Sequence, residues 1–210
     1  MHILLTRPLE DCSDLIIKFK ELGHSVSHFP LIKIKKMEYG EINFNDFSAI
    51  IFTSSNSIKN LNLDNINKTL KCFCVGSTTE KFARASGFQN VIAADGNVRA
   101  LKELILQNHD KKDGKILYVS GELVSFNLEE DLRKEGYQII RIINYSVEHN
   151  DGIKDDLIKE LKKNIPDIVY VYSENSSKSF LNIIKKYQLI DSWMNTNLMC
   201  IGEKTSSVLN

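Results

Sequence analysis

The sequence predicts an α/β protein made of two related units, each with a parallel sheet covered by helices on both faces. Three observations predict it. Apolar runs alternate with helical patterns along the whole chain. The run I-I-F-T-S-S-N-S at 50–57 is echoed by V-Y-V-Y-S-E-N-S at 169–176, and C-V-G-S-T-T at 74–79 by C-I-G-E-K-T at 200–205. Two ordered matches at nearly one spacing indicate an internal duplication.

The chain begins with one strand-helix-strand pattern. Residues 3–5 form a short apolar strand, and apolar residues then recur at helical spacing over 11–22 until Gly23 ends the helix. Residues 26–34 are extended, with Pro30 placing them at a sheet edge or at a bend.

The middle of the chain repeats the alternation several times. We expect strands at 49–53, 71–75, 91–94, 115–120 and 138–147, with helices starting at 57 and spanning 78–86, 98–107 and 128–135. After a turn at 150–152, we expect a helix at 153–163, a strand at 168–172, a helix at 176–187 and a strand at 198–201.

A third echo indicates how the domains are divided. F-K-E-L-G-H at 19–24 resembles L-R-K-E-G-Y at 132–137, each closing a strand-helix-strand unit. We therefore predict two flavodoxin-like parallel-sheet domains. Domain 1 combines 1–30 with 149–210, domain 2 is 38–141 inserted into it, and the linker strands are 31–37 and 142–148.

The duplication also works as a ruler. After 75–83 the first copy continues through a strand and a helix, whereas the second copy stops soon after 201–209. We expect domain 1 to lack its last strand and helix, about 30 residues by this ruler.

Composition narrows the function classes. The 27 basic and 27 acidic residues cancel, which argues against broad binding to nucleic acid or to an anionic membrane. No run of 18 apolar residues or signal-peptide pattern is present, so we expect no membrane-spanning helix and a cytoplasmic location. We also expect a monomer. Cys72 and Cys74 share one face of a strand, which predicts buried free thiols rather than a metal site.

Polar residues cluster where the predicted strands end and helices begin. Ligands bind at that edge of an open α/β sheet, and helix N-termini favour anions. Each such residue taken singly reads as a helix cap, but the set favours a cleft shared by two domains. The set is Ser54, Asn56, Ser57, Thr79, Ser173, Asn175, Ser176 and Thr205.

Three further positions stand out. Gly121, followed by Glu122, ends a strand and either admits a ligand close to the backbone or makes a turn. The motif with Gly202 lacks the spacing of a nucleotide-binding loop. Tyr145 lies on a crossing strand, where packing and catalysis are both open.

The ordered motifs resemble one family. L-L-T-R-P, I-I-F-T-S-S-N-S, C-V-G-S-T-T-E-K-F-A-R-A-S-G-F, L-Y-V-S-G-E, L-R-K-E-G-Y-Q-I-I-R-I-I-N-Y and C-I-G-E-K-T are similar, in this order, to uroporphyrinogen-III synthase over nearly the whole chain. The resemblance implies two α/β domains with the middle one inserted. It also implies cyclisation of hydroxymethylbilane with inversion of its last ring and loss of water, without metal or organic cofactor.

The resemblance assigns roles by position. Tyr145 matches a linker tyrosine proposed to assist departure of the hydroxyl, and Arg7 matches a basic residue at the first strand end. Ser54, Thr79, Ser173 and Thr205 match cleft positions. Asn56 stands where some relatives carry a basic residue.

Two other classes stay open from the residues. A non-catalytic hinge-type binding protein would have the same fold, and its ligand would leave unchanged. A glycosyl- or phosphotransferase would need a nucleotide, for which the chain shows no recognisable loop.

Overall fold

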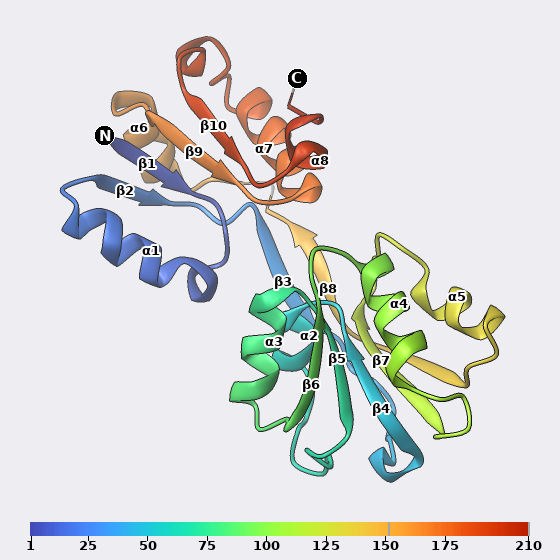
Figure 1. Cartoon of the computed structure of the whole chain (residues 1–210). Coiled ribbons are helices and arrows are strands. Elements are labelled where there is room, and N and C mark those ends of the chain that lie inside the picture. The colour runs from blue at the N-terminus through green and yellow to red at the C-terminus, as the bar shows by residue number, and fades with distance from the viewer. Residues whose placement is uncertain (151, 210) are drawn as a thin grey trace. The chain divides into compact units, whose positions relative to one another are not determined.

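The computed structural model describes residues 1–150 and 152–209, and Figure 1 shows their elements. The chain forms two compact units. The terminal unit combines Met1–Lys33 with Glu148–Asn210, and the middle unit is Ile34–Val147.

The terminal unit has a parallel sheet in the order β10-β9-β1-β2. Ile3 on β1 lies opposite Ile168 on β9, so the first strand shares a sheet with the late strands and not with 49–53, as the third echo predicts. The strands are β1 (His2–Leu5), β2 (Ser25–His28), β9 (Ile168–Val171) and β10 (Asn197–Cys200). The helices are α1 (Leu9–Glu21), α6 (Asp155–Lys163), α7 (Glu174–Lys186) and α8 (Glu203–Ser206), with a 3-10 helix, η2, at Asp191–Trp193.

Alternation along the strands fills two cores in this unit. Leu4 on β1 packs with residues of α6 and α7, whereas Ile3 and Leu5 pack with α1. Because neighbouring strand residues point to opposite faces, both faces of the sheet are covered.

The middle unit has a six-stranded sheet in the order β3-β8-β7-β4-β5-β6. Its α2 and α3 contribute to one apolar cluster and its α4 and α5 to another, so helices cover both faces. The strands are β3 (Ile32–Lys36), β4 (Phe47–Phe52), β5 (Lys71–Val75), β6 (Asn90–Ala94), β7 (Lys115–Gly121) and β8 (Ile139–His149). The helices are α2 (Ser55–Lys59), α3 (Gly76–Ala85), α4 (Val98–Asn108) and α5 (Leu128–Lys134), after a 3-10 helix, η1, at Phe44–Asp46.

The two crossing segments pair with each other. The N–H of Met37 donates to the carbonyl of Asn144 over 2.9 Å, and that of Asn150 to the carbonyl of Leu31 over 2.9 Å. As residue numbers rise on one segment they fall on the other, so β3 and β8 run antiparallel.

The two units share their spatial strand order but not their chain order. β1-α1-β2 corresponds to β7-α5-β8, and β9 and β10 correspond to β4 and β5, which are the segments that the sequence echoes join. Counted in chain order, the terminal sheet reads 2-1-3-4, as in the flavodoxin-like arrangement, and the parallel part of the middle sheet reads 3-2-1-4-5. Within the described residues, β6 has no counterpart in the terminal unit.

Two predictions from composition can be compared with the structure. Cys72 and Cys74 are free and buried, with their sulfurs 3.8 Å apart, as the strand periodicity predicts. The hydrogen bond between them and burial both raise the pKa of Cys72, which leaves its thiol unreactive. No helix in the part of the chain that the structure describes could span a membrane.

Candidate functional site

Gly121 and Tyr145 meet at the carboxyl end of β7. A Cβ atom on Gly121 would lie 2.6 Å from Cζ and 2.9 Å from the hydroxyl oxygen of Tyr145. The phenol therefore rests against the α-carbon of residue 121, and only glycine leaves room for it. Tyr145 is 9% exposed. This contact joins two residues that the sequence singled out separately.

Arg141 holds the same segment from another side. Its Nε donates to Ser120 Oγ over 2.7 Å, and its Nη2 donates to the carbonyls of Gly121 over 2.7 Å and Glu122 over 3.0 Å. The backbone N–H of Glu122 donates to the carbonyl of Tyr145 over 2.9 Å. β8 thus supports residues 120–122 at two points four residues apart, while the side chain of Glu122 is exposed.

Tyr118 lies on the same strand, β7, before Gly121. Its hydroxyl lies 3.4 Å from Thr53 Oγ1, at the end of β4. Burial raises the pKa of Tyr118, and the hydrogen bond to Thr53 and the charge of Arg141 act in the opposite direction. The phenol therefore stays protonated at neutral pH and can donate a hydrogen bond.

The strand-end residues Ser54, Asn56 and Thr79 mainly serve local structure. Ser54 caps α2 by accepting from the N–H of Asn56 over 3.2 Å. α2 is only five residues long, which makes it a poor source of a helix dipole. Thr79 lies in the first turn of α3 and is buried, and Val75 occupies the cap position.

The terminal unit places Arg7 and Tyr172 at its carboxyl edge. The guanidinium of Arg7 lies 4.8 Å from the centroid of the Tyr172 ring. Burial raises the pKa of Tyr172 to about 12, against the charge of Arg7. The hydroxyl of Tyr172 is buried without a hydrogen-bond partner among the described residues. This edge holds a partly exposed cation over an aromatic ring.

Ser173, Asn175 and Ser176 lie at the start of α7, as the duplication predicts. Ser173 Oγ accepts from the N–H of Ser176 over 3.1 Å and lies 2.9 Å from Ser176 Oγ. Asn175 is half-buried in the first turn. α7 spans thirteen residues, so its dipole is better developed than that of α2.

Gly202 and Thr205 flank the start of α8. Gly202 is the N-cap and has open space where a Cβ atom would lie. Thr205 is buried, and its carbonyl accepts from Ser177 Oγ over 2.7 Å. Thr205 therefore joins α8 to α7 through its backbone.

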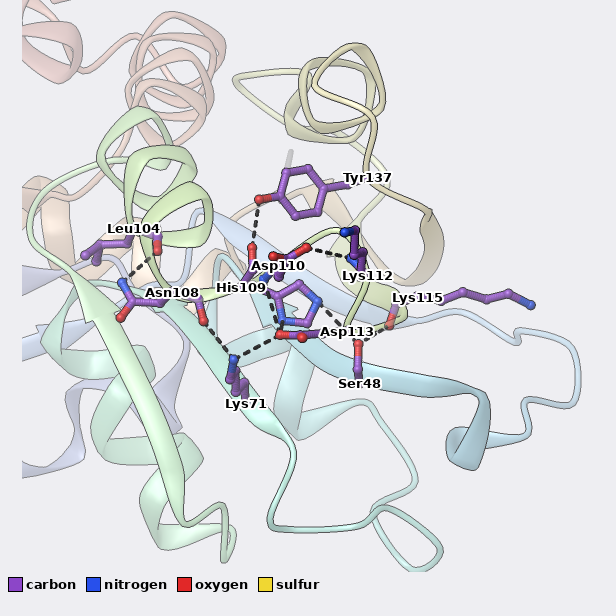
Figure 2. A network of polar contacts seen from close by, with 10 residues as sticks. All are labelled: Ser48, Lys71, Leu104, Asn108, His109, Asp110, Lys112, Asp113, Lys115 and Tyr137. Atoms are coloured by element: carbon purple, nitrogen blue, oxygen red, sulfur yellow. Dashed lines mark hydrogen bonds and ion pairs between the residues drawn. The ribbon is translucent and has the colours of Figure 1, made fainter.

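A polar network lies at the opposite, amino edge of the middle sheet, and Figure 2 shows it. Nε2 of His109 is 3.3 Å from Ser48 Oγ, and Nδ1 is 3.6 Å from Asp113 Oδ2. Lys71 donates to Asp113 over 3.2 Å and to the carbonyl of Asn108 over 2.8 Å. Burial lowers the pKa of His109, with the charge of Asp113 opposing it.

The order of Ser48, His109 and Asp113 is that of a hydrolytic triad, but the hydrogen bonds do not support that role. Ser48 donates its proton to the carbonyl of Lys115 over 3.2 Å, so Nε2 must donate to Ser48 rather than accept from it. A Cβ on Gly114 would come within 3.1 Å of Ser48 Oγ, which shows how closely the backbone covers the hydroxyl. The network ties the starts of β4, β5 and β7 to the end of α4.

Sequence reasoning missed Tyr118, Arg141 and Tyr172. A usable signal existed for Arg141, the single charge in the apolar run I-I-R-I-I. The described residues contain no group of three metal-capable side chains. A hollow of about 820 Å³ lies between residues 36–44 and 62–65, and no predicted site residue lines it.

The fold and these edges define a class: a two-unit parallel α/β protein with polar side chains and small residues at the carboxyl ends of its strands. The family model for uroporphyrinogen-III synthase HemD matches residues 13–210, and the chain belongs to that family. A search of curated proteins finds no match.

Two solved structures share the fold. A mutant uroporphyrinogen III synthase from the extremely thermophilic bacterium Thermus thermophilus is 14% identical, with a TM-score of 0.56 over 100% of this chain and 88% of that one. The uroporphyrinogen-III synthetase from Helicobacter pylori is 13% identical, with a TM-score of 0.59 over 99% of this chain and 95% of that one.

Proposed function

We propose that this protein cyclises hydroxymethylbilane to uroporphyrinogen III, inverting ring D and releasing water, as a step of tetrapyrrole biosynthesis. The family match over residues 13–210 carries the proposal. The chemistry makes the protein a lyase that needs no metal or organic cofactor, because the substrate's own pyrrole nitrogen can expel the hydroxyl.

In this proposal Tyr145 is the acid. As the carbon–oxygen bond breaks, the pyrrole nitrogen supplies the electron pair and the phenol gives its proton to the departing oxygen, forming water. The substituted carbon of ring D attacks the resulting azafulvene and forms a spiro intermediate. The bond from that carbon to the methylene bridge of ring C then breaks, which leaves a second azafulvene on ring C. The free carbon of ring D attacks this second azafulvene, which closes the macrocycle with ring D inverted. The final loss of a proton from the ring system returns a proton to the phenolate. The close packing of the phenol against the backbone of Gly121 favours this role, since an acid must be held near the oxygen that it protonates.

Substrate carboxylates need donors at the strand ends. Arg7 offers a cation, and the start of α7 offers backbone N–H groups beside Ser173, Asn175 and Ser176. Ser54, Asn56, Thr79, Gly202 and Thr205 stay in the proposed binding set. The first three and Thr205 act there mainly through the backbone that they hold. We further propose a cytoplasmic monomer without nucleic-acid or membrane partners.

The test is incubation with freshly prepared hydroxymethylbilane, followed by chromatographic separation of isomers I and III. Isomer III is expected in excess over a protein-free control, which closes without inversion. Recovery of isomer I at the control rate would contradict the proposal. Protection of the linear bilane from closure would favour the binding-protein alternative.

A further inference from the structure

Arg141 stands in an unusual place for a charge. It lies in the apolar run of β8, two residues from Ile139, which packs in the cluster beneath α4 and α5. Among the described residues no carboxylate forms an ion pair with it. A partly buried cation without a counter-ion is costly, so its hydrogen bonds must offset the loss of solvation.

Those hydrogen bonds all go to one segment. The guanidinium reaches Ser120 Oγ and the carbonyls of Gly121 and Glu122, at 2.7, 2.7 and 3.0 Å. The hydroxyl of Ser120 in turn donates a hydrogen bond to the carbonyl of Gly121 over 3.0 Å. The planar guanidinium can donate to all three acceptors at once, whereas the compact ammonium group of a lysine could not reach all of them.

The same segment also contacts Tyr145 on β8. The α-carbon of Gly121 faces the Tyr145 ring, and the N–H of Glu122 binds the Tyr145 carbonyl. The β7–β8 register also shifts here: Ser120 lies opposite Ile143, but Gly121 lies opposite Tyr145. The extra residue, Asn144, is fully buried and donates to the carbonyl of Ser57 over 2.7 Å. Irregularities of this kind re-aim the side chains beside them.

We infer that Arg141 is a positioning residue: it holds residues 120–122 in place, and the ring of Tyr145 packs against Gly121 in that segment. The inference rests on the proposed role of Tyr145 as the acid. Without the guanidinium, the carbonyl of Glu122 loses this donor and that of Gly121 keeps only Ser120 Oγ, so the segment is held less firmly. The phenol then loses a fixed surface, and its proton is less well placed for the leaving oxygen.

The kinetic test is a double-mutant cycle with Arg141→Gln and Tyr145→Phe. Arg141→Gln is expected to lower kcat by roughly tenfold or more, with KM changed less than about threefold, and isomer III still formed. In the Tyr145→Phe background, Arg141→Gln should lower kcat by no more than about a further threefold, because both residues affect the same proton transfer. Arg141→Lys keeps charge and stem and should recover only part of kcat. Arg99→Gln, an exposed arginine of the same unit, is the matched control.

A second measurement does not depend on activity. Tyrosine labelled with ¹³C at Cζ gives seven signals at most, and the one lost in Tyr145→Phe belongs to Tyr145. That signal should shift in Arg141→Gln and in Arg141→Lys but not in Arg99→Gln. An unmoved signal, an additive kinetic loss, or a rise in KM at constant kcat would overturn the inference. A shifted signal in a protein that makes no isomer III would overturn the proposed function and leave the positioning role standing.

Discussion

The two units repeat one sheet and use its carboxyl edge differently. In the middle unit β7 ends in Gly121, covered by Tyr145 and held by Arg141. Its counterpart β1 leads into Arg7, whose guanidinium lies over Tyr172. One edge fixes a phenol against a bare backbone, and the other presents a partly exposed cation. The two units therefore share a scaffold but carry different side chains at the ends of corresponding strands.

The comparison leads us to propose a division of labour. The middle edge assists the leaving group, and the terminal edge binds substrate carboxylates. Variants at matched positions of the two units test this division.

The largest effect is expected at Gly121. Gly121→Ala forces the Tyr145 ring to move, because the new Cβ would lie 2.6 Å from it. We expect kcat to fall on the order of 100-fold, the cost of a displacement near 1 Å. Gly40→Ala is the control, since its Cβ would meet open space and Gly40 is outside the proposed binding set. Equal turnover of the two variants would show that the Gly121–Tyr145 contact has no part in the reaction.

The two tyrosines give the next contrast. Tyr145→Phe should lower kcat roughly 10- to 100-fold with isomer III still favoured, because the pyrrole nitrogen supplies most of the driving force. Tyr172→Phe should leave kcat nearly unchanged. Steady-state rates and isomer ratios measure both. A switch to isomer I in Tyr145→Phe would assign it to shaping the substrate instead.

Arg7 tests the terminal edge. Arg7→Gln removes a cation that we propose binds a substrate carboxylate, so KM should rise about tenfold while kcat changes little. Raising the salt concentration should also raise the KM of the wild-type enzyme, because salt screens the attraction between Arg7 and the carboxylate. A loss in kcat at constant KM would place Arg7 with the chemistry and end the proposed division.

The smallest effect concerns His109 and pH. Its folded pKa is below the unfolded value near 6.5, so the unfolded state binds the proton first as pH falls. Stability should decline as pH falls through about 6.5, until the lower folded pKa is reached. Between pH 7.5 and 5.5, the Tm of the wild-type protein should fall further than the Tm of His109→Gln, by a few degrees at most. Thermal unfolding of both proteins measures this difference. Parallel curves for the two proteins would exclude this histidine as the cause.

The sequence alone determined the strand-helix alternation, because hydrophobic periodicity is local. It also showed the duplication and, through the third echo, the pairing of the first strand with the late ones. It located Gly121 and Tyr145 as separate candidates, since each belongs to a recognisable strand end or crossing strand. It did not reveal that the glycine exists to make room for the tyrosine.

That contact and the Arg141 bonds depended on tertiary structure. Residues 121 and 145 come together only through the register of β7 against β8, and that register shifts by one residue at Asn144. A shift of one residue changes which side chain faces a given glycine, and no local pattern encodes it. The same holds for Arg7 over Tyr172: the two are far apart in the chain, and only the parallel pairing of β1 with β9 places their strand ends side by side.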